Sequence, residues 1–322
     1  IFGDFFVVDE RSFSDRNYVN VNAHELAHQW FGDFISMRNW RDIWLHESFA
    51  THYAKLCEKE IFGEEYYQWA KYREMQRAFE ASSESIKPIA HSSAGTARIY
   101  PKGSFVLDML KDVIGREDYN CAVKYYLEKY AYQNVTTEDF MLAFHEALGY
   151  DLTWFFNQWI LHGGEPEYQV RHELREGNLL KLTVEQIQNT HGGRVGVFKM
   201  PVDIEVGLKS GKKFNTTVMN DERFEIYELQ LPEEMTYMIF DQGNKIIKRI
   251  DHPKTQKELY EQAAGASQMI DQFMAAMELE VQELEDGEEA IGGLFNSASS
   301  KYLRAALLKN MVHIDTESYP LL

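Results

Sequence analysis

Residues 24–31 read "HELAHQWF", with two histidines four positions apart and a glutamate beside the first. In an α-helix, residues four apart differ by about 40° around the axis and by about 6 Å along it, so His24 and His28 can both bind one metal ion. Glu25 lies about 100° from His24, so it can reach a metal-bound water without coordinating the metal. The stretch therefore predicts a helix that carries a zinc site, with Glu25 as the general base of a hydrolase.

The same stretch also fits an ordinary core helix. Apolar residues at helical spacing run from Val19 to Phe31, and Gly32 ends the predicted helix. A neutral histidine on such a face is commonly a hydrogen-bonded core residue, but Glu25 then shares the helix without a basic neighbour. Because burial of an unpaired carboxylate is costly, a bound cation explains the pattern better. The stripe that we expect to be buried on this helix consists of Ala23, Leu26, Ala27, Trp30 and Phe31.

A hydrolytic zinc ion usually has three protein ligands and keeps a fourth position for water. We interpret Glu47 as the third ligand, because the 18 residues between His28 and Glu47 allow the chain to cross a loop and return on a second helix. That helix is predicted between Asp42 and Gly63, and the stretch "WLHESFA" at residues 44–50 contains the glutamate. The sequence thus predicts one zinc ion per chain.

Composition and charge argue against several classes of partner. The 322 residues have a formal net charge of −18 and contain no basic stripe, so we expect no nucleic-acid partner. No run approaches the roughly 18 apolar residues of a membrane span, and no secretory leader is visible. We expect a soluble protein of undetermined compartment, with the cytoplasm favoured over the periplasm and secretion. The start at Ile1 suggests a fragment or a processed product.

The spacing of apolar residues divides the chain into three predicted domains. Residues 1–165 show helical patterns joined by turns, with a loop at 82–101 and one helix that begins after Thr136 and ends at Gly149. Residues 166–251 contain β-forming stretches separated by hairpin turns, which predicts a small antiparallel β-sandwich. Residues 252–322 return to helical spacing and are predicted to be part of a C-terminal helical domain. The expected fold class is multidomain α plus β.

Several stretches resemble the aminopeptidase N family of zinc aminopeptidases, which belongs to the gluzincins. "HELAHQWFGD" at 24–33 is similar to the family's HELAHQWFGN, and "WLHESFA" is similar to WLNEGFA; the departures are Asp33, His46 and Ser48. The 18-residue spacing fits this family, whereas thermolysin-like endopeptidases use one residue more. "IYPKGSFVLDML" at 99–110 resembles the family's tyrosine segment, in which Lys102 and Gly103 have a positioning role. "FFNQWILHGGEPEY" at 155–168 resembles the end of its catalytic domain.

The resemblance implies both a chemistry and a domain order. The zinc ligands it implies are His24, His28 and Glu47. It also implies that Glu25 is the general base and that Tyr100 donates its phenol to the oxyanion of the tetrahedral intermediate. The expected fold is a thermolysin-like helical catalytic domain, then a β-sandwich, then a helical domain. The expected reaction is hydrolysis of the N-terminal peptide bond of peptides that have a free N-terminus.

One part of the family pattern is missing from the sequence. The family has a GAMEN segment upstream of a stretch like "IFGDFFVVDERSF", whose glutamate binds the free amino group of the substrate with help from an N-terminal β domain. Neither occurs here, so the activity of this chain alone is an open question. Three alternatives therefore stay open: a zinc endopeptidase or epoxide hydrolase on the same scaffold, a non-catalytic metal-binding or peptide-binding module, and a metal-free helical domain. Tyr100 then has the simpler interpretation of a packed loop residue.

Overall fold

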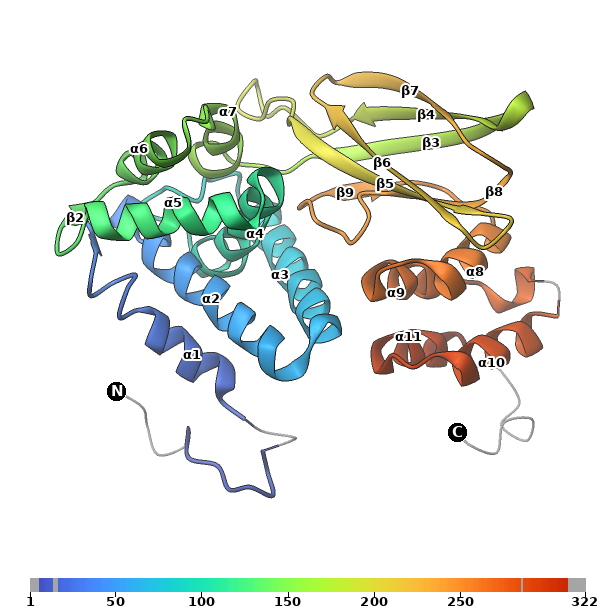
Figure 1. The fold of residues 1–322 in the computed structure, drawn as a ribbon, viewed down its shortest axis with the longest axis horizontal. Coiled ribbons are helices and arrows are strands. Elements are labelled where there is room, and N and C mark those ends of the chain that lie inside the picture. Colours follow the sequence, from blue (N-terminus) through green and yellow to red (C-terminus); the bar gives the residue numbers. More distant parts are fainter. Residues whose placement is uncertain (1–5, 14–16, 285, 312–322) are drawn as a thin grey trace. The chain divides into compact units, whose positions relative to one another are not determined.

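The computed structural model describes residues 6–13, 17–284 and 286–311. The chain divides into two compact units, Ile1–Gly164 and Glu165–Leu322. Figure 1 shows that helices make up most of the first unit, whereas the second contains twisted sheets followed by helices. This mixed content of helices and sheets agrees with the expected fold class. The division into three domains stays a prediction, because the sheets and the C-terminal helices lie in one compact unit.

The first unit contains seven α-helices among its described residues. Strands β1 (Ser36–Met37) and β2 (Asn134–Val135) form a two-stranded parallel sheet. A 3-10 turn spans Trp40–Asp42, and π-helical turns span Arg98–Lys102 and Asn157–Leu161. The α-helices are α1 (Val19–Ala27), α2 (Trp44–Phe62), α3 (Glu64–Glu84), α4 (Gly103–Ile114), α5 (Arg116–Lys129), α6 (Thr137–Leu148) and α7 (Thr153–Phe156).

The beginning of α2 is fixed against the beginning of α6. The buried indole of Trp44 donates from Nε1 to Thr137 Oγ1 at 2.9 Å. The buried carboxylate of Asp42 accepts from the backbone N and the Oγ1 of Thr137, at 3.0 and 2.8 Å. One turn further along α2, Phe49 packs between Phe31 and Phe140. Because these contacts are buried, the first turn of α2 and its side chains have a fixed direction.

The second unit contains two sheets, with strand orders β7-β4-β3-β9 and β6-β5-β8. All pairs are antiparallel except β3 with β9, which is parallel. The strands are β3 (Glu167–Arg175), β4 (Leu179–Gln186), β5 (Met200–Leu208), β6 (Lys213–Asn220), β7 (Phe224–Gln230), β8 (Met235–Phe240) and β9 (Arg249–Asp251). The helices are α8 (Gln256–Gly265), α9 (Met269–Glu278), α10 (Gly287–Ser297) and α11 (Lys301–Met311), with 3-10 turns at Glu176–Asn178 and Val281–Glu283.

Period-two burial explains why the strands of the second unit form where they do. In β4, Leu180, Leu182 and Val184 are fully buried, and the residues between them are partly exposed. Val184 lies opposite the equally buried Val170 of β3, so both strands direct the same face toward the core. The predicted helix of the first unit that ends at Gly149 is also confirmed. Its capping box pairs Thr136 with Asp139, and Gly149 takes the left-handed conformation.

Three details of the sequence prediction are wrong. Helix α1 ends at Ala27, and Leu26 and Trp30 are 60% and 48% exposed rather than buried. The physical reason is that α1 packs mainly on α2, so the side of the helix that faces α2 is the side that is well covered. The predicted loop at 82–101 is shorter, because α3 continues to Glu84 and a π-helical turn begins at Arg98.

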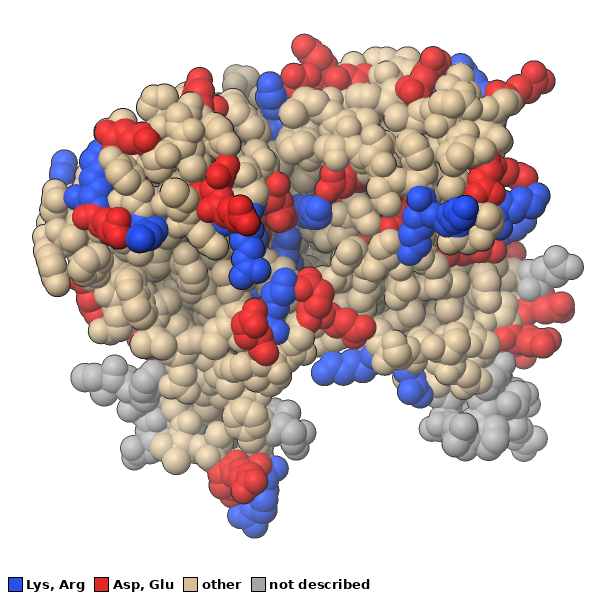
Figure 2. Space-filling view, in the orientation of Figure 1, with Lys and Arg blue, Asp and Glu red and all other residues tan. Residues whose placement is uncertain are grey.

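Charged side chains of both signs are mixed on the molecular surface. On the face drawn in Figure 2, Lys and Arg side chains lie among Asp and Glu side chains, in line with 33 basic and 51 acidic residues in the sequence. The excess of acidic residues gives a field that repels polyanions at long range. Within the described residues, no helix combines the length and the apolar character that crossing a membrane requires.

Candidate metal centre

Helices α1 and α2 bring three potential metal ligands together. His24 lies in the last turn of α1, His28 follows that helix as its C-cap, and Glu47 lies in the first turn of α2. His24 Nε2 is 3.1 Å from His28 Nε2, and Glu47 Oε2 is 3.3 Å from His24 Nε2 and 3.4 Å from His28 Nε2. All three side chains are partly buried. Of the described residues, only these place three metal-ligating atoms within 4.8 Å of one another.

The three ligand atoms have the spacing that a zinc ion requires. Bonds of 2.0–2.2 Å in a tetrahedral site place ligand atoms about 3.3–3.6 Å apart. The observed separations of 3.1, 3.3 and 3.4 Å are close to this range. Two imidazoles and one carboxylate are also a typical ligand set for a hydrolytic zinc ion, with one position left for water. The residues present therefore fit zinc.

A backbone contact orients one of the imidazoles. His28 Nδ1 lies 3.0 Å from the carbonyl oxygen of Phe31, which favours the tautomer with the proton on Nδ1. The lone pair of His28 Nε2 is then directed toward His24 and Glu47. A second-sphere carbonyl of this kind commonly fixes the ring orientation of a metal-binding histidine.

The electrostatics of the cluster favour a carboxylate beside the two rings. Burial acts to raise the pKa of Glu47, but hydrogen bonds from His24 and His28 outweigh it and lower this pKa to about 2. The hydrogen bond to Glu47 raises the pKa of His28 above its usual value. Glu47 is thus a permanent anion at neutral pH, as a metal-binding carboxylate must be.

Glu25 and Tyr100 line one cavity together with His24. The cavity has a volume of about 860 Å³ and is formed by residues of α1, α2, α3 and the π-helical turn before α4. Glu25 is exposed on α1, one residue after His24. Its position agrees with a side chain that faces solvent in the cavity rather than the ligand cluster.

Tyr100 lies in the π-helical turn Arg98–Lys102, directly before α4. Its ring stacks on the His24 ring, with a centroid distance of 5.8 Å and an interplanar angle of 20°. Burial and the negative charge of Glu47 raise the pKa of the Tyr100 phenol to about 12. The phenol therefore remains protonated at neutral pH and can donate a hydrogen bond. Single π-helical turns are frequent at functional sites, which fits this position.

Several contacts hold the Tyr100 turn against the ligand helix. Ser48, buried beside Glu47, donates from Oγ to the carbonyl of Ile99 at 2.7 Å. A Cβ at Gly103 would lie 1.8 Å from Ser48 Oγ, so this close approach requires glycine. The buried Lys102 donates from Nζ to the carbonyl of Gly164 at 3.1 Å. These contacts support the positioning role expected for Lys102 and Gly103.

His46 and Ser48, the two residues beside Glu47 that differ from the family pattern, each make a hydrogen bond. Ser48 contacts Ile99 as described, and His46 Nε2 accepts from the backbone N of Met37 at 2.7 Å. Burial lowers the pKa of His46, which agrees with a neutral ring that acts as an acceptor. Both residues differ from the family pattern, but their hydrogen-bond partners are 51 and 9 residues away in the sequence and no local pattern identifies them.

Charged side chains that were not predicted as site residues form one wall of the cavity. Helix α3 contributes Arg73, Glu74, Arg77 and Glu80, and α2 contributes Lys55 and Glu58. Lys55 Nζ forms an ion pair with the buried Asp108 at 2.6 Å and a further one with Glu74. Burial raises the pKa of Glu74 to about 7. The arginine-rich composition of α3 was visible in the sequence, but the side of the helix that faces the cavity was not.

Comparison with known proteins identifies the family. Residues 4–159 match the peptidase family M1 domain. The matched part of the chain is a peptidase family M1 domain. This confirms the resemblance to the aminopeptidase N family. The matched residues include His24, His28, Glu47, Glu25 and Tyr100.

Curated relatives of this M1 domain are longer proteins. The chain is 29% identical over 259 residues to the tricorn protease-interacting factor F2 of Thermoplasma volcanium, which covers 76% of the chain and 32% of the relative. It is 31% identical over 198 residues to the probable aminopeptidase 2 of Sulfurisphaera tokodaii, which covers 58% of the chain and 25% of the relative. The chain thus spans about a third or less of the length of these relatives.

A solved structure shares the fold of this M1 chain. The aminopeptidase A of Legionella pneumophila, crystallised in complex with aspartic acid, superposes with a TM-score of 0.66. The alignment covers 89% of this chain and 32% of that protein, at 20% sequence identity. At this identity the similarity shows the fold alone.

Proposed function

We propose that this chain carries the zinc site of an aminopeptidase and hydrolyses the N-terminal peptide bond of peptides with a free N-terminus. The observation that carries the proposal is the set of 3.1–3.4 Å separations among His24 Nε2, His28 Nε2 and Glu47 Oε2 beside a large cavity. Membership of family M1, together with relatives named as aminopeptidases, supports the choice of reaction. Zinc is held by His24, His28 and Glu47 in this proposal, one ion per chain.

Glu25 is the general base of the proposed reaction. A bound zinc ion supplies a Lewis acid that polarises the peptide carbonyl and lowers the pKa of water toward neutrality. Glu25 accepts a proton from the attacking water and transfers it to the leaving amine. Its exposed position in the cavity, beside His24 and outside the ligand cluster, suits this role.

Tyr100 stabilises the negative charge that develops on the carbonyl oxygen. Its raised pKa keeps the phenol protonated, so it can donate a hydrogen bond to the oxyanion. Ser48, Lys102 and Gly103 position the turn that carries it. The positioning matters because a donor stabilises the transition state only when it is aimed before the reaction begins.

The test is zinc content per chain in protein purified without chelator, paired with hydrolysis of leucine p-nitroanilide. We expect one equivalent of zinc and hydrolysis that a chelator abolishes and added zinc restores. The matched substrate is the N-acetylated anilide, which an aminopeptidase does not cleave but an endopeptidase accepts. Protein without stoichiometric zinc would contradict the proposal. One equivalent of zinc without hydrolysis would favour a metal-binding module.

A further inference from the structure

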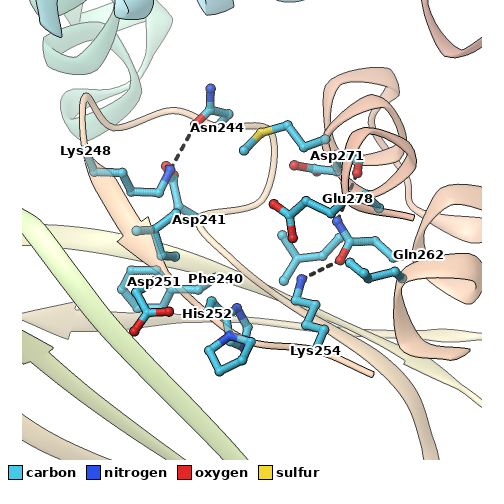
Figure 3. Close-up of a pocket in the computed structure, with 16 residues that line it drawn as sticks. Phe240, Asp241, Asn244, Lys248, Asp251, His252, Lys254, Gln262, Asp271 and Glu278 are labelled. Atoms are coloured by element: carbon cyan, nitrogen blue, oxygen red, sulfur yellow. Dashed lines mark hydrogen bonds and ion pairs between the residues drawn. The ribbon is translucent and has the colours of Figure 1, made fainter. Parts of the chain in front are cut away.

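A second polar cavity, which we call the Lys254 cavity, is lined by residues of the second unit. It has a volume of about 240 Å³ and is bordered by the end of β8, the segment from Asn244 to Lys254, and helices α8 and α9. Figure 3 shows polar side chains from all of these segments directed toward it. Its apolar wall includes Phe240, Leu259, Met274 and Ala275. The first unit and the candidate metal centre contribute no residue to its lining.

On one side of the cavity the charges neutralise one another. Lys248 Nζ binds the carboxylate of Asp241 and donates to Asn244 Oδ1 at 2.9 Å, and all three side chains are buried. Asp241 also accepts from the backbone N of Lys245 and of Ile246. This group is a closed buried network, so it has little capacity left for a ligand.

On the other side the charges are only partly compensated. The Lys254 ammonium has three N–H donors, but Gln262 Oε1 is its one hydrogen-bond acceptor among the described residues. Glu278 is an exposed residue without a hydrogen bond or ion pair within the part of the chain that the structure describes. Its carboxylate is directed toward Lys254 in Figure 3 and attracts this ammonium electrostatically. Asp271 is buried and accepts from the backbone N of Gly243 at 2.8 Å.

Burial moves each of these groups toward its neutral form. It lowers the pKa of Lys254 to about 8 and raises the pKa of Asp271 to about 7. The pKa of Glu278 is raised as well, mainly by burial. A ligand that supplied both a carboxylate and an ammonium would compensate the acid and the base together. A ligand with one charge would leave either the buried Asp271 or the partly buried Lys254 without a counter-charge from the ligand.

The remaining properties of the cavity restrict the ligand further. About 240 Å³ is below the roughly 300 Å³ at which pockets for drug-sized molecules begin, so a smaller molecule fits better. The apolar wall favours a ligand with an aliphatic part. A metal ion does not fit, since the three-ligand cluster found among the described residues lies in the first unit. We propose that the cavity between β8, α8 and α9 binds a free α-amino acid with an apolar side chain, its carboxylate on Lys254 and its ammonium near Glu278 and Asp271.

The experiment uses L-leucine as the probe and the full chain. Binding is measured by calorimetry in the double variant His24→Ala/His28→Ala, which removes the candidate metal centre as a second binding place. We expect this variant to bind one leucine per chain. Lys254→Met is expected to weaken binding at least tenfold, because it removes a charged hydrogen-bond donor and keeps the aliphatic stem. The matched control is Lys257→Met, an exposed lysine of α8 outside the cavity, which should leave binding unchanged.

Two further measurements keep the proposal falsifiable if Lys254→Met does not fold. Met274→Trp fills the apolar side of the cavity and should abolish leucine binding with Lys254 intact. Two leucine analogues, 4-methylpentanoate without the amine and isoamylamine without the carboxylate, should each bind at least tenfold more weakly than leucine. The proposal is overturned if leucine does not bind the double variant, if Lys254→Met and Met274→Trp bind as the parent does, or if either analogue matches leucine.

Discussion

The candidate metal centre and the Lys254 cavity differ in how their polar groups are compensated. In the metal centre, three ligand atoms converge to within 4.8 Å, and hydrogen bonds keep Glu47 ionised. In the Lys254 cavity, burial shifts Lys254 and Asp271 toward neutrality. The first arrangement suits a cation that draws all three ligands together. The second suits a molecule that carries both charges on separate atoms. In both units the proposed ligand site is a group of polar side chains that converge without fully compensating one another.

Removal of the general base should have the largest effect. Glu25→Gln keeps the size of the side chain but cannot accept the proton, so we expect kcat to fall by about 10²–10⁴-fold. Zinc content should be unchanged, because Glu25 is not among the converging ligand atoms. Kinetics with leucine p-nitroanilide and elemental analysis measure the two quantities. A variant that cleaves at the parental rate would exclude Glu25 as the base.

Removal of the Tyr100 hydroxyl should have the next largest effect. Tyr100→Phe retains the ring that stacks on His24 but removes the donor, and kcat should fall by about 10²–10³-fold. KM should change little, since the lost hydrogen bond strengthens in the transition state. The exposed Tyr132→Phe serves as control and should have parental kinetics. Equal rates for Tyr100→Phe and the parent would assign Tyr100 a packing role.

Removal of the proposed third ligand, Glu47, should mainly weaken metal binding. Glu47→Ala should weaken zinc binding by at least about 10–100-fold, the range already seen when only outer-sphere partners are removed. Competition with a fluorescent zinc chelator gives the affinity. Glu60→Ala, at an exposed acidic residue of the same helix, is the control. Unchanged zinc affinity in Glu47→Ala would exclude it as a ligand.

The raised pKa of Asp271 predicts a pH-dependent stability of the second unit. Burial raises this pKa from 3.8 to about 7, so the folded state binds more protons than the unfolded state between these values. The free energy of unfolding therefore falls as the pH rises from about 4 to 7. Asp271→Asn should remove this slope and stabilise the protein at pH 8 by at least about 1.4 kcal/mol, equivalent to one pKa unit.

Urea denaturation at pH 4, 6 and 8 measures the slope. Asn can still accept the hydrogen bond from Gly243, so the contact at 2.8 Å is retained. The exposed Asp221→Asn is the control and should keep the parental slope. The prediction is wrong if Asp271→Asn and the parent show parallel stability curves from pH 4 to pH 8.

The smallest expected effect comes from the hydrogen bond between α2, which carries Glu47, and the turn that carries Tyr100. Ser48→Ala removes the hydrogen bond to Ile99, worth about 1 kcal/mol, and should lower kcat about fivefold with zinc affinity unchanged. The control Ser83→Ala removes a comparable contact to a backbone carbonyl on the exposed side of α3. A loss of stability without any change in kcat would show that Ser48 is structural only.

The features that could be predicted from the sequence depend on short spacings between residues along the chain. The four-residue spacing of His24 and His28 and the 18-residue return to Glu47 are set by helix geometry and one loop, and the structure brings these three residues together. The capping box at Thr136 and the alternation in β4 follow in the same way from local periodicity. Such patterns are readable because backbone geometry alone relates the residues involved.

Tertiary structure decided what depends on distant neighbours. Leu26 and Trp30 have helical spacing but are exposed, because burial requires a packing partner that spacing alone does not supply. Ser48 meets Ile99 across 51 residues, and the Lys254 cavity joins β8 to α9. Residue type and spacing along the chain indicate which face of a helix or strand a side chain occupies. The path of the chain in space determines which residues pack against that face. For this protein, the sequence determined the residues and spacing of a candidate metal-binding helix pair. The fold determined the cavity beside that pair, the tyrosine turn and, within the second unit, the partly compensated charges of the Lys254 cavity.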